Sequence, residues 1–295
     1  MPYLWLGIGL LAGAAKGFCG KKTSGHITGW QDAMLVNLLR MVICVVIGLA
    51  MALVSGDEIP FSRDPVVWGI YSLSGVTTAV FVVTWMIAVR SSAYVLISVF
   101  TMLGTIVPML LGRFCYNESI FWNQWVGFGL LVLSTGILCL HNNKVKSKLK
   151  WKDLVLLILC GCANGLSSFS QKMFQAEIPG GSVGVFNLYT YLICGVCLLI
   201  VYISTRTQKA EKPKKLSKIV VLYMPVMAVC LFLNSYFYTM AAGSIPASLL
   251  YPLTQGAGLV LSGLMSALLF REKLTARAVI GLFVAFAGLM VTKFL

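Results

Sequence analysis

Acidic residues and histidines are scarce in this sequence, which has nine Asp or Glu and two His among 295 residues. Enzyme active sites and metal sites are commonly built from several such side chains held close together. His26 and His141 lie far apart in the sequence, and all nine acidic residues fall in loops or at the ends of apolar runs. We therefore expect no metal site, no cofactor and no enzyme activity.

Charged residues of either sign are also few. They make up 11% of the chain, whereas 59% of the residues are hydrophobic and the mean hydropathy is +0.89. This composition leaves too little polar surface to cover a water-soluble globule. Most of the nine cysteines lie inside apolar stretches, where a free thiol behaves as a small hydrophobic side chain. The sequence predicts an all-α integral membrane protein without a disulfide framework.

The apolar runs have the length needed to cross a bilayer. A hydrocarbon core about 30 Å thick requires about 20 apolar residues of helix. The first run lacks the basic leader of a secretory signal, so we expect it to be retained as a helix. The ten expected transmembrane helices are residues 3–20, 30–54, 66–88, 92–114, 122–140, 153–172, 183–204, 217–240, 246–270 and 275–294.

The net charge of +14 comes from basic residues that gather in short loops. Lys and Arg in short loops resist translocation and stay on the cytoplasmic side of a membrane. The loops that follow the first, third, fifth, seventh and ninth runs hold seventeen of them, and the opposite loops hold four. This asymmetry predicts that both termini lie outside the cytoplasm, and it explains the positive charge without a nucleic-acid partner.

The two halves of the chain repeat one another in order, as membrane transporters commonly do. Residues 13–18 (GAAKGF) match residues 161–166 (GCANGL), and residues 37–44 (NLLRMVIC) match residues 187–194 (NLYTYLIC). The remaining matches are Glu118 with Glu272, Gly129 with Gly281, and Gly136 with Gly288.

The repeat predicts an inverted architecture. Each unit crosses the membrane five times, an odd number, so the second copy enters from the opposite side. We expect a first five-helix repeat at residues 1–143, a basic cytoplasmic connector at 144–152 and a second five-helix repeat at 153–295. The glycine-spaced segments 122–140 and 275–294 are expected to serve as scaffold, because small residues let helices approach closely in lipid.

These features resemble the drug/metabolite transporter superfamily, specifically its EamA-type members with ten helices in two halves. The resemblance rests on the small-residue opening helix of each half and on Glu118 and Glu272 before a glycine-spaced last helix. One departure is Ser262 at the position equivalent to Pro108, so a kink at Pro108 need not recur in the second half. The resemblance implies a central cavity and transport of small organic solutes.

Two basic side chains fall inside the apolar runs, where a charge is costly and is a candidate for function. Arg40 lies about 15 Å along its predicted helix at 1.5 Å per residue, near the midplane. It could bind a carboxylate or phosphate bidentately, or could cap the carbonyls of a broken helix. Lys16 could reach the membrane interface with its long stem or could bind substrate.

Polar and aromatic residues supply further candidates for the cavity wall. Asn164, Ser168 and Gln171 share a polar stripe on one predicted helix. Tyr251 and Gln255 flank a proline, and their repeat equivalents point to Ser98 and Thr101. Aromatic rings could hold a cation through cation–π attraction or could belong to the interfacial belts. The aromatic candidates are Trp85, Tyr94, Tyr236 and Tyr251.

Together these observations predict a secondary transporter, an exporter or exchanger, that moves a small polar metabolite across the cytoplasmic membrane. A positive charge at the midplane favours an anionic or zwitterionic solute such as an amino acid. Two alternatives remain open, a carrier for a cationic amine that uses an aromatic box and a carrier or flippase for a lipid-linked phosphate. The expected partners are a small-molecule substrate and the lipid bilayer, and a homodimer is left open.

Overall fold

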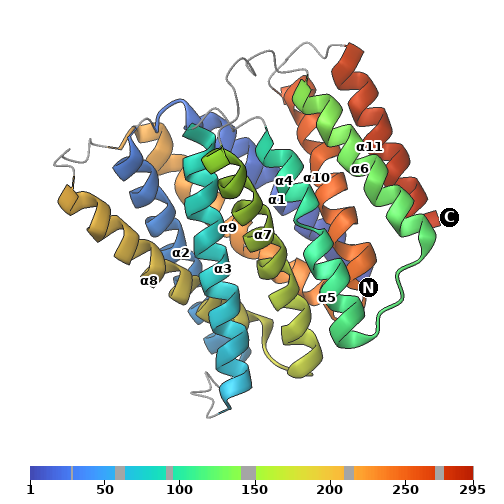
Figure 1. The fold of residues 1–295 in the computed structure, drawn as a ribbon. Helices are drawn as coiled ribbons and strands as arrows, with labels where there is room; N and C mark the ends of the chain where they lie inside the picture. Colours follow the sequence, from blue (N-terminus) through green and yellow to red (C-terminus); the bar gives the residue numbers. More distant parts are fainter. Residues whose placement is uncertain are drawn as a thin grey trace. The chain divides into compact units, whose positions relative to one another are not determined.

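The computed structural model describes residues 1–27, 29–56, 64–90, 96–140, 151–208, 216–269 and 276–294. These ranges form helices joined by short turns, and none of them contains a strand (Figure 1). The helices are α1 (Pro2–Ser24), α2 (Trp30–Ser55), α3 (Pro65–Arg90), α4 (Ile97–Leu103), α5 (Ile106–Tyr116), α6 (Trp122–Leu140), α7 (Trp151–Glu177), α8 (Val183–Gln208), α9 (Lys218–Ala242), α10 (Ala247–Leu269) and α11 (Ala276–Phe294).

The helices have the lengths expected for ten membrane crossings. Within the described ranges, eight spans are long and apolar enough to cross a bilayer, and α4 and α5 together make one of them. The remaining helices, α6 with 19 residues and α10 with 23, complete the ten. The predicted all-α, ten-helix membrane fold is confirmed.

One crossing is discontinuous. The span Ile97–Tyr116 breaks between α4 and α5 at Gly104 and Thr105, four residues before Pro108. Proline has no backbone N–H, so the carbonyl of Gly104 loses its usual helical donor and accepts instead from the N–H of Val107 at 3.1 Å. At the corresponding place in the second half, α10 runs without a break through Ser262. The helix is interrupted near Pro108, as predicted, and the equivalent helix of the second half is continuous at Ser262.

The described chain divides into two compact units, each of which takes helices from both halves of the sequence. The first unit contains residues Met1–Ala79 and Met173–Gly243, and the second contains Val80–Lys172 and Ser244–Leu295. The boundary predicted between two sequence repeats therefore does not coincide with a boundary between compact units. Most of the predicted connector, at residues 144–150, lies outside the described residues.

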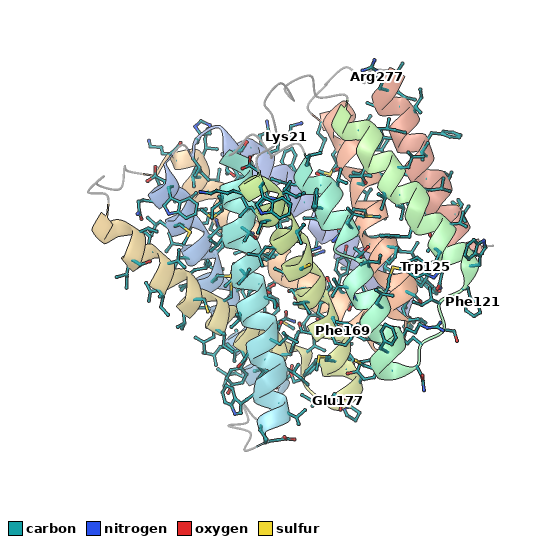
Figure 2. All side chains as sticks on the ribbon, in the orientation of Figure 1. Lys21, Phe121, Trp125, Phe169, Glu177 and Arg277 are labelled. Carbon is teal, nitrogen blue, oxygen red and sulfur yellow. The ribbon has the colours of Figure 1, made fainter. Side chains whose placement is uncertain are left out.

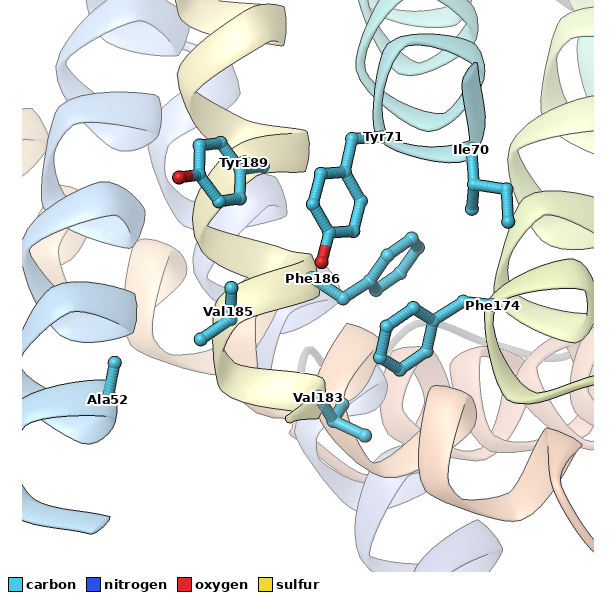
Figure 3. Close-up of a cluster of buried hydrophobic side chains, with 8 residues drawn as sticks. All are labelled: Ala52, Ile70, Tyr71, Phe174, Val183, Val185, Phe186 and Tyr189. Atoms are coloured by element: carbon cyan, nitrogen blue, oxygen red, sulfur yellow. The ribbon is translucent and has the colours of Figure 1, made fainter. Parts of the chain in front are cut away.

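In the first unit, α1 packs against α9 and α2 packs against α8. Its apolar core is centred on Tyr71, Phe174, Phe186 and Tyr189, all at most 6% exposed (Figure 3). Tyr71 stacks on Tyr189 with ring centroids 4.9 Å apart, and Phe174 stacks on Phe186 at 4.6 Å. These rings fill their space with one another, so they form packing rather than an open aromatic box.

In the second unit, α6 and α11 lie side by side and run antiparallel (Figure 1). Figure 2 shows Phe121 and Trp125 at the start of α6, at the opposite end of the pair from Arg277 at the start of α11. Gly288 packs against the backbone of Gly127, and Gly281 packs against Leu138. By contrast, nothing lies within 4 Å of a side chain added at Gly129 or Gly136. The sequence predicted a scaffold role for these glycine-spaced helices and not their pairing, and in α6 Gly127 makes the contact, on a different face from Gly129 and Gly136.

Candidate functional site

Arg40 is the residue around which the candidate site is built. It lies near the middle of α2, a helix that packs against α8 and α9. The helix positions Asn37 one turn before it and Cys44 one turn after it, on the same face. The side chain is only partly exposed and lies close to Cys44 on α2 and to Tyr191 and Cys194 on α8.

The guanidinium of Arg40 uses one of its three nitrogens within the described structure. Its Nη1 donates to Oδ1 of Asn37 at 3.0 Å, and Nδ2 of Asn37 donates to the carbonyl of Ala33 at 2.9 Å. Nε of Arg40 is buried and has no hydrogen-bond partner. Nε and Nη2 form the side edge of the fork that binds carboxylate or phosphate with two parallel hydrogen bonds. Asn37 therefore orients the guanidinium and leaves this edge available.

Lys16 supplies a second positive charge beside the first. It lies in the C-terminal half of α1, is partly buried, and is close enough to Arg40 for their like charges to interact. Its other electrostatic neighbours are the thiols of Cys44 on α2 and Cys230 on α9. The structure thus brings Lys16 close to side chains of α2 and α9.

The cation pair, Lys16 and Arg40, has no carboxylate partner among the described residues. The described acidic residues are Asp32, Asp64, Glu118, Asp153 and Glu177. An uncompensated charge in a medium of low dielectric constant is costly, and two adjacent like charges increase the cost. An anion that enters between the two side chains would remove both penalties.

The walls of the site are fixed by hydrogen bonds between the helices of the first unit. Asn234 on α9 donates to the carbonyl of Gly9 on α1 at 2.8 Å, and its side chain occupies the space that a Cβ at Gly13 would need. Ser235 on α9 donates to Oδ1 of Asn187 on α8 at 2.6 Å. The hydroxyl of Tyr191 donates to the carbonyl of Leu231 at 3.3 Å. These bonds join α9 to α1 and to α8, and the thiol of Cys44 joins α2 to α9 by donating to the carbonyl of Ala228.

In the second unit the structure brings together Thr101, Asn164, Ser168 and Tyr251. At the α4–α5 break the N–H of Thr105 bonds to Met102, so the carbonyl of Thr101 loses its usual donor. Asn164 on α7 replaces that donor with its Nδ2, at 3.4 Å. Ser168 donates to the carbonyl of Asn164 at 3.0 Å, and its own carbonyl accepts from the hydroxyl of Tyr251 at 2.5 Å. These contacts give the four residues structural tasks at a broken helix.

A largely buried ion pair lies farther along α7 in the same unit. Lys172 contacts Glu118 at 2.6 Å, with the two side chains 13% and 12% exposed. The other carboxylate oxygen of Glu118 accepts from the N–H of Ala247 at 2.7 Å, in the first turn of α10. A carboxylate is favoured there because the first N–H groups of a helix have no partner within it. Glu118, identified from the repeat, thus joins the end of α5 to α7 and α10.

The remaining predicted site residues have varied surroundings. Tyr236 in the first unit packs on Phe232 and Phe237 with ring centroids 6.2 Å and 5.5 Å away, as part of the apolar core. In the second unit Trp85 is 43% exposed, Ser98 is exposed, and Gln171 and Gln255 are partly buried. Tyr94 lies outside the described residues.

Sequence reasoning missed the neighbours that the fold brings to Arg40 from other helices. Tyr191, Cys194 and Cys230 were not singled out as site residues, although Cys44 lies four residues after Arg40, at helical spacing. The alternative in which Arg40 caps a broken helix finds no support, because no carbonyl of the described residues accepts from it. Asn164 fills that structural task instead.

Comparisons with known proteins agree with this architecture. The sequence matches the EamA-like transporter family over residues 1–140 and 146–294, which covers both halves. One protein of known crystal structure superposes with a TM-score of 0.80 at 13% sequence identity, over 99% of this chain and 96% of that one. At this identity the likeness shows the fold alone. No curated protein matches the sequence.

Proposed function

Because this chain belongs to the EamA-like transporter family, within the drug/metabolite transporter superfamily, we propose that it carries a small anionic or zwitterionic metabolite, such as an amino acid, across the cytoplasmic membrane. Membership establishes a membrane transporter, and the solute and mechanism are the proposal. Transport would proceed by alternating access, as an exporter or exchanger, because the inverted repeats allow two related conformations of the same helices.

The observation that carries the proposal is the unpaired Nε on the side edge of the Arg40 guanidinium. Asn37 holds one end of the guanidinium, and Nε is buried without a partner. A buried donor that lacks an acceptor costs free energy, about 1–3 kcal/mol, which a bound oxyanion would recover. The site therefore supports binding of a carboxylate or a phosphate, the groups for which this edge has matching geometry.

A thermal-shift screen of the purified protein tests the proposal, because a solute that binds only the folded state raises the apparent melting temperature. The panel would contain amino acids, organic acids, phosphate esters and choline-like amines. We expect an anionic or zwitterionic solute to stabilise the wild type and to lose its effect in Arg40→Gln. The control is Arg113→Gln, which removes an exposed arginine at the end of α5 and should leave the shift unchanged.

Other outcomes of the screen would contradict the proposal. Stabilisation by a quaternary amine that survives Arg40→Gln and vanishes in Tyr251→Ala would favour the aromatic box for a cation. Stabilisation confined to phosphate headgroups on lipid chains would favour a lipid-linked phosphate carrier. A solute shift that is equal in Arg40→Gln and the wild type would place binding elsewhere.

We further propose that both termini lie outside the cytoplasm. The support is the distribution of basic residues in the sequence, seventeen in one set of loops and four in the other. A C-terminal fusion to a reporter that works only outside the cytoplasm should show reporter activity. A reporter active only in the cytoplasm would overturn the orientation.

A further inference from the structure

We infer that the cation pair selects a solute with two negative charges on oxyanion groups, such as a dicarboxylate or a phosphate monoester, over a zwitterion. This inference rests on the proposed function and narrows its substrate class. It follows from the number of charges at the site and from the hydrogen-bond acceptors that surround them.

The charge count is the first step. Lys16 and Arg40 interact as like charges, and the described residues supply no carboxylate to either of them. A zwitterion brings one negative charge and one positive charge, so the total charge at the site stays at plus two and a third cation is added to the repulsion. A dianion brings the total to zero. Because Coulomb energies grow as the dielectric constant falls, this difference is larger here than in water.

The acceptors at the site are the second step, since a substrate ammonium needs oxygen atoms to receive its hydrogen bonds. Oδ1 of Asn37 already accepts from Arg40, and Oδ1 of Asn187 already accepts from Ser235. The thiol of Cys44 donates to the carbonyl of Ala228 at 3.4 Å. Among the described residues, the amide oxygen of Asn37 and the thiol of Cys44 are neutral and already hydrogen-bonded, so neither gives an ammonium a negatively charged partner.

The geometry of the two cations is the third step. The side edge of Arg40 suits one planar carboxylate or two oxygens of a phosphate. The ammonium of Lys16, which approaches from α1 rather than α2, is a point charge that an anion can contact from any direction. One oxyanion group at Arg40 and a second negative charge at Lys16 would satisfy both residues.

Cys230 provides a probe that requires no knowledge of the natural solute. It lies on α9 close to Lys16 and is partly exposed. The wild-type protein in nanodiscs would be treated with methanethiosulfonate reagents of equal size, one anionic with a sulfonate and one cationic with a trimethylammonium. Modification of Cys230 would be measured by peptide mass spectrometry, with Cys230→Ser as the blank. Each rate would be divided by the rate of the same reagent with a small thiol in solution.

We expect the anionic reagent to be favoured by about tenfold or more, because a site of one sign concentrates ions of the other. Arg40→Gln and Lys16→Gln should each lower the ratio severalfold, and the double variant should bring it near one. Lys21→Gln, an exposed lysine on the same helix, should leave the ratio unchanged. Lys16→Met serves as a second neutral variant where Lys16→Gln does not fold.

The outcomes separate this inference from the proposed function. A ratio that falls in Arg40→Gln but not in Lys16→Gln would overturn the two-charge site and leave the Arg40 site in place. A ratio that falls in neither variant would overturn both. A Cys230 that no charged reagent reaches would overturn this inference, because a solute could not then reach Lys16, and would leave the Arg40 site to the thermal-shift screen. The matched solutes succinate and β-alanine then test selectivity directly. They share one carboxylate and a two-carbon spacer, and the second group is a carboxylate in succinate and an ammonium in β-alanine. Succinate should slow the modification of Cys230 more than β-alanine at equal concentration, and the reverse order would overturn the inference.

Discussion

Asn37 and Asn187 occupy equivalent positions in the two sequence repeats, and each donates its side-chain amide to the carbonyl four residues earlier, at 2.9 Å to Ala33 and 3.0 Å to Val183. Their amide oxygens have different partners. Oδ1 of Asn37 accepts from Arg40 in its own helix, whereas Oδ1 of Asn187 accepts from Ser235 on α9. The same local arrangement thus orients a charge in one repeat and joins two helices in the other.

This difference predicts that the same isosteric substitution, Asn to Asp, affects solute binding at position 37 and stability at position 187. Asn37→Asp would place a carboxylate against Arg40 and neutralise it, so the anion-dependent thermal shift should disappear while the protein stays folded. The preference of Cys230 for the anionic reagent should fall as far as it does in Arg40→Gln. An anion-dependent shift of wild-type size in Asn37→Asp would show that Arg40 does not bind the solute.

Asn187→Asp is the matched control. Asn187 is fully buried, and its side chain bonds to the carbonyl of Val183 and the hydroxyl of Ser235, neither of which is a cation. A carboxylate there loses its donated bond to the carbonyl of Val183 and must be desolvated, so we expect a loss of stability of about 1–3 kcal/mol. Because Asn187 bonds to Ser235 and not to a cation, the reagent preference of Cys230 should fall less than it does in Asn37→Asp. Thermal unfolding and labelling of the same preparation would check both expectations.

The ion pair between Glu118 and Lys172 predicts a graded series. Glu118→Ala removes both the partner of Lys172 and the acceptor for the N–H of Ala247, so it should be the most destabilising change. Glu118→Gln keeps an acceptor for that N–H, and Lys172→Met keeps the carboxylate beside the N-terminus of α10, so each should cost less. Removal of one partner from a fully buried pair costs about 3–5 kcal/mol, and the residual exposure here lowers our expectation to about 1–3 kcal/mol. Equal melting temperatures for all three variants would contradict this account.

The fold was largely predictable from the sequence, and the neighbours of the site were not. Ten apolar runs of about 20 residues leave few alternatives to ten membrane helices, and the repeat indicates their inverted order. The break before Pro108 was predictable because proline lacks an N–H. In contrast, the proximity of Arg40 to Tyr191 and Cys194 involves helices that are distant in sequence. Hydrophobic periodicity in single helices does not show which faces meet.

The glycines of α6 and α11 also show that the sequence alone does not reveal which helix faces meet, and they provide a prediction. A Cβ at Gly127 would meet Thr292 and would lie 2.8 Å from the carbonyl of Gly288, whereas Gly129 has open space around it. Gly127→Ala should therefore separate the two helices and destabilise the protein by about 1–3 kcal/mol. Gly129→Ala should be neutral or stabilising by up to about 1 kcal/mol, because alanine favours a helix. Thermal unfolding in one detergent would compare the two, and a greater loss in Gly129→Ala would be evidence against this packing.

The last prediction concerns the link between Asn164 and the broken helix. Asn164→Leu leaves the carbonyl of Thr101 without a donor, and a loss of about 1–3 kcal/mol is expected for an unsatisfied buried group. In Pro108→Ala the carbonyl of Gly104 regains a helical donor, and the helix can run straight so that the N–H of Thr105 returns to Thr101. Asn164→Leu should therefore cost less in the Pro108→Ala background, with a coupling of about 0.5–2 kcal/mol in a double-mutant cycle.

Ser168→Ala is the control for that cycle, because the hydroxyl of Ser168 bonds to the carbonyl of Asn164 within α7. It lies one turn from Asn164 on the same helix face but does not contact the broken segment through that hydroxyl, so its cost should be the same in the wild-type and Pro108→Ala backgrounds. Additive costs for Asn164→Leu and Pro108→Ala would mean that the amide does not replace the missing backbone donor. Asn164 would then be free to bind a solute.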